Sequence, residues 1–132
     1  MNGMTENRFV FDTNAVIFLT TIDNSIPPDL KDELNEAALF TSVISEIELL
    51  SKPSLLPDEE ENLRAFLAER ILIIDLTNDV KKETIELRRN TRLKLPDCIV
   101  AATAIVLNAV LLTADKHLLN LSWPGLRTQK IY

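Results

Sequence analysis

Short apolar runs alternate along the chain with longer segments in which apolar residues recur at helical spacing. Continuous apolar runs of this length are typical of strands that are buried on both faces of a sheet. They predict four strands, at residues 8–11, 38–41, 71–74 and 110–113, and a fifth strand is expected at residues 127–131.

Helices are expected between these strands, where capping and helix-breaking residues mark their ends. Several begin at a proline, which suits the first helical turn. Ser42 can cap one further helix, and Thr77 or Asn78 can cap another. The expected helices cover residues 15–19, 28–37, 43–51, 57–70, 78–92, 97–108 and 115–119, and a turn-rich loop occupies residues 20–28.

The alternation of strands and helices predicts a parallel sheet with helices on both faces. We therefore expect an α/β fold of three layers, α/β/α, with a central, mainly parallel sheet of four to five strands. The length of 132 residues suits one domain with its own core. No repeat or low-complexity tract divides the chain, so a single domain over residues 1–132 is expected.

Charge and composition exclude several classes of protein. The formal net charge is −6, so any nucleic acid must be held by metal ions and a local basic patch instead of bulk charge. Only two glycines are present, which excludes a glycine-rich phosphate loop. No apolar run approaches the roughly 18 residues of a membrane span, and residues 1–5 lack the pattern of a signal peptide. Because Cys98 is the single cysteine, we expect a cytoplasmic protein.

Three aspartates stand where parallel strands would bring them together. Asp12 follows the first strand directly, Asp115 follows the fourth strand by two residues, and Asp97 begins the helix that leads into that fourth strand. Ligands of open α/β sheets bind beyond the carboxyl ends of the strands. Carboxylates gathered there repel by roughly 4 kcal/mol per close pair unless a cation lies between them. The positions therefore predict an acidic metal site.

Each aspartate also stands at the start of a helix, which offers a simpler explanation. A carboxylate there caps free backbone N–H groups and meets the positive end of the helix dipole. For any one aspartate the two explanations are equally good, and the metal hypothesis rests on all three sharing one edge of the sheet. Asp97 adds to it, because its helix is almost wholly apolar and its own face is shared with Val100 and Ala104.

A glutamate after the second strand can supply a fourth carboxylate. Glu46 and Glu48 lie on one predicted helix, about 200° apart around its axis. Both flank the apolar stripe of that helix, so their spacing alone does not decide which of them faces the site.

Four segments of the chain resemble the PIN-domain nucleases, and most closely the VapC-type toxins of bacterial and archaeal toxin–antitoxin pairs. Each segment carries one acid of the family pattern, and together they run in the family's order over almost the whole chain. The third is the most specific. The segments are Phe11-Asp12-Thr13-Asn14, Ser42-Val43-Ile44-Ser45-Glu46-Ile47-Glu48-Leu49, Leu95-Pro96-Asp97-Cys98-Ile99-Val100-Ala101-Ala102-Thr103-Ala104 and Leu112-Thr113-Ala114-Asp115-Lys116-His117-Leu118.

The resemblance implies a metal-dependent endoribonuclease with Asp12, Glu48, Asp97 and Asp115 as catalytic residues and metal ligands. It selects Glu48 over Glu46, because the family's glutamate directly precedes a leucine. Mg²⁺ or Mn²⁺ is the expected ion, since these cations prefer hard oxygen ligands. The implied reaction is in-line attack of a metal-activated water on an RNA phosphodiester.

Three polar residues beside the acids are expected to orient the carboxylates, namely Thr13, Asn14 and Thr113. The chain departs from the family pattern at Ala114, where an arginine is usual, and at residues 51–53, where a glycine is usual. These departures leave the four acids in place, but they change the expected substrate contacts near the last aspartate.

Basic residues precede the third aspartate and offer a contact surface for RNA. Lys81, Arg88 and Arg92 are predicted to share one helix face, and contacts to phosphates dominate the affinity for nucleic acid. The alternative is a solvated face that is paired with neighbouring glutamates. His117 is expected to be a surface residue of a short helix. The expected RNA contacts are Arg88, Arg89, Arg92 and Lys94.

The resemblance also implies a cognate antitoxin protein and a second copy of the chain as partners, and no membrane. Two other functions compete. An aspartyl-phosphate phosphohydrolase of the haloacid-dehalogenase type would use Asp12 as its nucleophile, but its motif has an acid at the position of Asn14. A non-catalytic binding module with the PIN fold would have no reason to keep all four acids.

Overall fold

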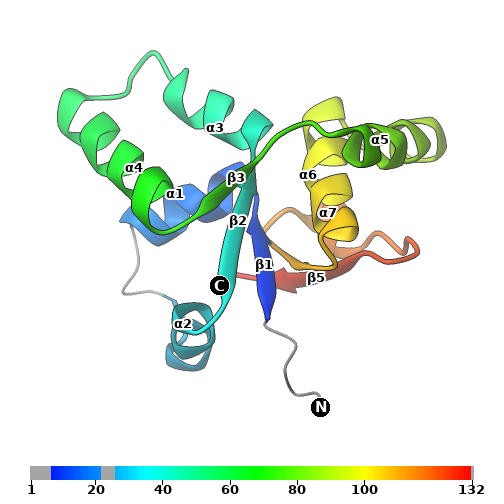
Figure 1. The fold of residues 1–132 in the computed structure, drawn as a ribbon, viewed down its shortest axis with the longest axis horizontal. Coiled ribbons are helices and arrows are strands. Elements are labelled where there is room, and N and C mark those ends of the chain that lie inside the picture. Colours follow the sequence, from blue (N-terminus) through cyan, green and yellow to red (C-terminus); the bar gives the residue numbers. More distant parts are fainter. Residues whose placement is uncertain (1–6, 22–25, 132) are drawn as a thin grey trace.

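Five parallel strands form the centre of the protein. The computed structural model describes residues 7–21 and 26–131, and its strands lie in the order β3-β2-β1-β4-β5 in one sheet (Figure 1). The strands are β1 (Arg8–Phe11), β2 (Ala38–Ser42), β3 (Leu72–Ile74), β4 (Val110–Thr113) and β5 (Arg127–Lys130). All neighbouring pairs are parallel, so the five carboxyl ends lie along one edge, and the predicted sheet is confirmed.

Helices cover both faces of this sheet and complete the predicted α/β/α layers. Helices α1, α2 and α4 lie on one side and α5, α6 and α7 on the other, while α3 contacts both α1 and α6 (Figure 1). The helices are α1 (Thr13–Thr21), α2 (Pro28–Asn35), α3 (Val43–Leu50), α4 (Pro57–Glu69), α5 (Asn78–Asn90), α6 (Leu95–Val106) and α7 (Lys116–Leu119). None of the helices in the described residues has the length and apolar character needed to cross a membrane.

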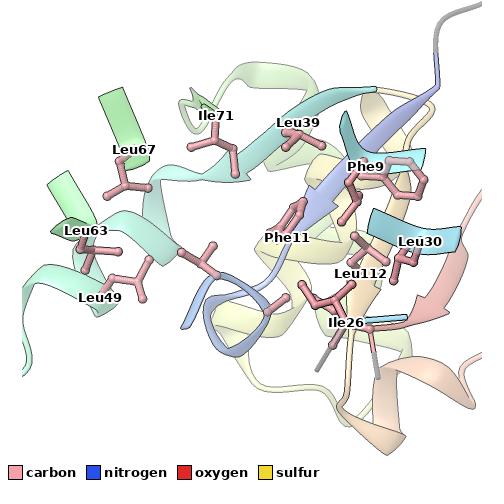
Figure 2. Packing of buried hydrophobic residues seen from close by; sticks show 14 residues of the cluster. Phe9, Phe11, Ile26, Leu30, Leu39, Leu49, Leu63, Leu67, Ile71 and Leu112 are labelled. Atoms are coloured by element: carbon pink, nitrogen blue, oxygen red, sulfur yellow. The ribbon is translucent and has the colours of Figure 1, made fainter. Parts of the chain in front are cut away.

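The central strand β1 contributes side chains to both hydrophobic layers, because successive residues of a strand point to opposite faces. Phe9 and Phe11 pack with Leu39 and Leu112 in the cluster beneath α1, α2 and α4 (Figure 2). Val10 packs in the opposite cluster, under α5 and α6. Burial on both faces explains why these strands are apolar without alternation.

Helix α6 fixes the position of one predicted acid. Its residues from Cys98 to Ala104 are all buried, and it contacts both β1 and β4. The alanines in this stretch have little bulk, so the helix packs closely against the sheet and against α5. Asp97 directly precedes the buried stretch, so the packing holds it near the carboxyl ends of β1 and β4.

Helix α5 ends at residue 90, whereas the sequence predicts residue 92. Thr91 takes an extended conformation (φ −133°, ψ 173°), and its hydroxyl accepts a hydrogen bond of 3.2 Å from the N–H of Leu93. Arg92 therefore follows the helix instead of extending it. The prediction that Lys81, Arg88 and Arg92 share one helix face is wrong.

Strand β3 is less buried than its apolar sequence predicts. Leu72 is 64% exposed, because β3 is one of the two edge strands of the sheet in the described part of the chain. Smaller differences concern helix ends, since α2 ends at residue 35 and α6 begins at residue 95. Residues 22–25 of the predicted loop and the N-terminal residues 1–5 lie outside the described residues.

Candidate functional site

Four acids line one cavity at the carboxyl edge of the sheet. Its volume is about 310 Å³. Asp12 follows β1, Asp115 follows β4, Asp97 lies in the first turn of α6, and Glu48 comes from α3. The structure thus brings together the four acids that the sequence nominates from four separate segments. Glu46 does not line this cavity.

Asp12 is the most buried of the four acids, with 9% of its surface exposed. One carboxylate oxygen accepts a hydrogen bond of 2.7 Å from the N–H of Ala15, and the other accepts one of 2.5 Å from the Thr113 hydroxyl. Burial raises the pKa of Asp12 above its ordinary value, and the negative charges of Asp115 and Glu48 raise it further. The two hydrogen bonds oppose this shift, because they stabilise the ionised form.

Asp97 has a half-buried carboxylate beside the other acids. Burial is the largest cause of the raised pKa of Asp97. The negative charges of Asp115, Asp12 and Glu48 raise this pKa further, whereas the positive charge of Lys94 lowers it. No hydrogen-bond donor among the described residues reaches its carboxylate, and it does not cap its helix. A half-buried carboxylate without a protein partner is costly, so Asp97 is the acid most available to an external cation.

Asp115 and Glu48 are each held by hydrogen bonds from the protein. Asp115 caps α7, because one of its oxygens accepts from the N–H groups of His117 at 2.7 Å and Leu118 at 3.4 Å. Glu48 accepts a hydrogen bond of 2.6 Å from the Thr13 hydroxyl.

The polar residues expected to orient the acids have different surroundings. Thr13 holds Glu48, and Thr113 holds Asp12. Asn14 lines the cavity and has an exposed side chain. The capping explanation is therefore correct for two of the three aspartates. It does not compete with cation binding, since a carboxylate oxygen has two lone pairs.

The donor set suits a hard divalent cation, because it consists of carboxylates. In the part of the chain that the structure describes, however, no three His, Cys, Asp or Glu side chains stand close enough to enclose an ion. The donors fit Mg²⁺ or Mn²⁺ in their chemistry, and they would have to draw closer around the ion.

Two basic regions border the acids, and sequence analysis found only one of them. Lys52 lines the acid cavity and was missed, since it follows α3 in the segment that departs from the family pattern. On the other side lies a second cavity of about 390 Å³, which shares Asp97 and Asp115 with the first. Arg92 and Lys94 line it, as sequence analysis expects of RNA contacts.

The other two expected RNA contacts do not line this second cavity. The guanidinium of Arg88 donates a hydrogen bond of 3.1 Å to the carbonyl oxygen of Leu93, which gives it a structural use. Arg89 lies on an exposed part of α5. His117, expected only at the surface, is exposed and also lines the second cavity.

An apolar groove also adjoins the acid cavity, and among the described residues it shares no lining residue with the second cavity. It lies between α1, α3 and α4, has a volume of about 130 Å³, and is lined in part by Leu49, Leu55 and Leu63. Ile17 and Lys52 line both this groove and the acid cavity. An occupant of the groove would therefore lie directly beside the four acids.

These features place the protein among α/β/α domains that gather carboxylates at the carboxyl edge of a parallel sheet. The chain belongs to the PIN domain family, whose sequence profile matches residues 9–124. Sequence comparison with curated proteins gives no match. The family to which four sequence segments point is thus confirmed.

Three of the solved structures similar to this chain are VapBC or toxin–antitoxin complexes. A chain of VapBC2 from Rickettsia felis, bound to a DNA fragment from its promoter, is 24% identical with a TM-score of 0.73, covering 93% of this chain and 98% of that chain. A chain of a toxin–antitoxin complex from Klebsiella pneumoniae is 28% identical with a TM-score of 0.67, covering 89% and 93%. A chain of DNA-bound VapBC from Salmonella typhimurium is 22% identical with a TM-score of 0.73, covering 96% and 99%.

Proposed function

We propose that the protein is a metal-dependent endoribonuclease and the toxin of a VapBC-like toxin–antitoxin pair. One observation carries this proposal: Asp12, Glu48, Asp97 and Asp115 line a single cavity although they come from four separate segments. Membership of the PIN domain family supports a nuclease, and PIN nucleases generally use divalent metal ions.

Residues of this chain orient the carboxylates of the cavity to bind a cation and a phosphodiester. Thr113 and Thr13 hold the carboxylates of Asp12 and Glu48 in fixed orientations. Asp97 offers a carboxylate that no protein donor uses in the described residues. Mg²⁺ or Mn²⁺ held by the four acids would supply Lewis acidity for attack of water on the phosphodiester.

The apolar groove between α1, α3 and α4 supports a protein partner. Its leucines suit the apolar face of a helical or extended segment, and such grooves are a common mode of peptide recognition. We assign it to the cognate antitoxin, in line with the likeness to chains of toxin–antitoxin complexes. A homodimer and a cytoplasmic location belong to the same proposal, and sedimentation of the purified protein tests the first.

Cleavage of RNA tests the proposed activity. The purified protein should cut an end-labelled single-stranded RNA with Mn²⁺ and leave it intact in EDTA. Asp97→Asn and Glu48→Gln should reduce single-turnover cleavage by orders of magnitude. Glu46→Gln is the matched control, because Glu46 lies on the same helix as Glu48 but outside the cavity, and it should cleave like the parent.

Three outcomes would contradict the proposal. Full cleavage by the Asp97→Asn variant would remove the acids from the mechanism. Hydrolysis of an aryl phosphate with phosphate trapped on Asp12, while RNA stays intact, would favour the phosphohydrolase. A protein that binds its antitoxin but hydrolyses neither compound would be a binding module.

A further inference from the structure

We propose that the second cavity is a nucleotide subsite that binds the RNA strand immediately beside the phosphodiester at the four acids. Arg92, Lys94 and His117 would contact the strand there. This inference rests on the proposed function and deepens it, because it states along which side of the acid cavity the bound RNA strand continues.

The position of the cavity supports this assignment. The second cavity shares Asp97 and Asp115 with the acid cavity, so an RNA strand that occupies both cavities passes over these two residues. Its volume of about 390 Å³ lies within the range of small-ligand pockets, about 300–1,000 Å³. Nucleotides are joined in a continuous strand, so a strand at the acids has its next unit beside them.

The two cations of the subsite are free to bind phosphates. Arg92 and Lys94 are exposed, and neither forms an ion pair with a carboxylate of the described residues. Lys94 acts on Asp97 only through its charge, by lowering the pKa of that acid. A protein of net charge −6 needs such a local basic patch to hold RNA.

The backbone that carries these cations is fixed before any ligand arrives. The hydroxyl of Thr91 accepts from the N–H of Leu93, and the guanidinium of Arg88 donates to the carbonyl oxygen of Leu93. The side chain of Leu93 is also buried. Arg88 and Thr91 are therefore positioning residues, which hold the segment that presents Arg92 and Lys94 at the cavity.

The remaining wall suits a sugar and a base. His117 and Leu121 also line the cavity, and an imidazole ring can stack on any base. The backbone N–H of His117, and not its side chain, bonds to Asp115. A substitution of His117 therefore leaves the cap of α7 intact.

Equilibrium binding tests the subsite separately from cleavage. A fluorescently labelled single-stranded oligoribonucleotide is titrated in EDTA, where the proposed nuclease cannot act. The double variant Arg92→Ala/Lys94→Ala should bind at least tenfold more weakly than the parent. The slope of log affinity against log salt should fall by about 1.4, for two phosphate contacts on a single strand. His117→Ala should weaken binding by a smaller factor.

The matched control removes two exposed cations of α5 that line neither cavity, as Lys81→Ala/Lys82→Ala. It should retain parental affinity and salt slope, and melting curves should show that all variants fold. In single-turnover cleavage with Mn²⁺, Arg92→Ala/Lys94→Ala should raise the half-saturating protein concentration and leave the maximal rate nearly unchanged.

Parental RNA binding by Arg92→Ala/Lys94→Ala would overturn the subsite. So would equal losses in the double variant and the α5 control, because general charge would then explain both. If the double variant binds RNA normally but loses a polyglutamate peptide, the cavity recognises an acidic protein segment instead. A protein that binds RNA through these residues but never cleaves it would refute the proposed activity and leave the subsite standing.

Discussion

The hydroxyl of Thr113 connects two of the four acids at the level of single atoms. The hydroxyl donates a hydrogen bond to a carboxylate oxygen of Asp12, and the hydroxyl oxygen of Thr113 accepts one of 3.0 Å from the N–H of Asp115. The orientations of these two acids are thus coupled to the end of β4. Asp97 has no such support, so its contribution should appear mainly in charge and not in structure.

A pH series on metal-free protein tests the charge of Asp97. Its pKa is raised above the ordinary value of an aspartate, so the folded protein binds this proton more readily than the unfolded chain does. The protonated carboxyl group of Asp97 therefore favours folding below the unfolded pKa, and this stabilisation is lost as the pH rises through the raised folded pKa. Asp97→Asn removes the effect, so its stability relative to the parent should increase with pH across that window and then stay constant.

Urea unfolding at several pH values measures this difference. At neutral pH and without metal, Asp97→Asn should be at least as stable as the parent. The substitution removes a half-buried negative charge that is repelled by the other three acids. The matched control is Asp79→Asn, which removes an exposed acid from the first turn of α5, outside both cavities. A clear loss of stability in Asp97→Asn alone would show that this carboxylate has a structural role.

At the scale of elements, the N-cap residue of α5 should stabilise this helix, and substitutions at the start of α5 test its contribution. Thr77 is the cap that the structure selects, since its side chain accepts from the N–H of Val80 at 3.2 Å. Thr77→Ala should lower the free energy of unfolding by about 1 kcal/mol. Asn78→Ala, one residue along, should change it little. Urea midpoints compare the two, and equal losses would contradict this assignment.

Sequence patterns were reliable for elements that are buried on both faces. The strands around β1 and the apolar helix α6 are predictable because their whole surface must be apolar. The exposure of Leu72 was not predictable, because no local pattern says which strand forms the edge of a sheet. The end of α5 was missed for a similar reason, since Thr91 tolerates both helical and extended conformations.

In the candidate site, too, some residues could be predicted from local sequence patterns, and others depend on how distant segments pack. The aspartates after β1 and β4 were predictable because parallel strands align their ends. Glu48 needed the family resemblance, since spacing left Glu46 equally acceptable. Lys52 and His117 gave no signal, because their place beside the acids depends on how loops and short helices pack.

The response of the whole molecule to divalent ions tests whether the four acids act together. Mn²⁺ at 100 times its dissociation constant should stabilise the fold by about 2.7 kcal/mol, because it binds only the folded arrangement. Thermal melting in EDTA and in millimolar Mn²⁺ measures this. The double variant Asp12→Asn/Asp97→Asn should lose most of the shift. Identical curves for the parent in both buffers would show that the folded protein does not bind Mn²⁺.

The order of strands in the sheet also decides when the acids can meet during synthesis. β1 is made first but lies at the centre, between β2 and β4, so its second partner is separated from it by about a hundred residues of chain. Asp12 and Asp115 come together only when β4 has paired with β1. A nascent chain that ends before β4 has no acid cavity, so a ribosome making this protein carries a chain without its four-acid site until the sheet closes around its first strand.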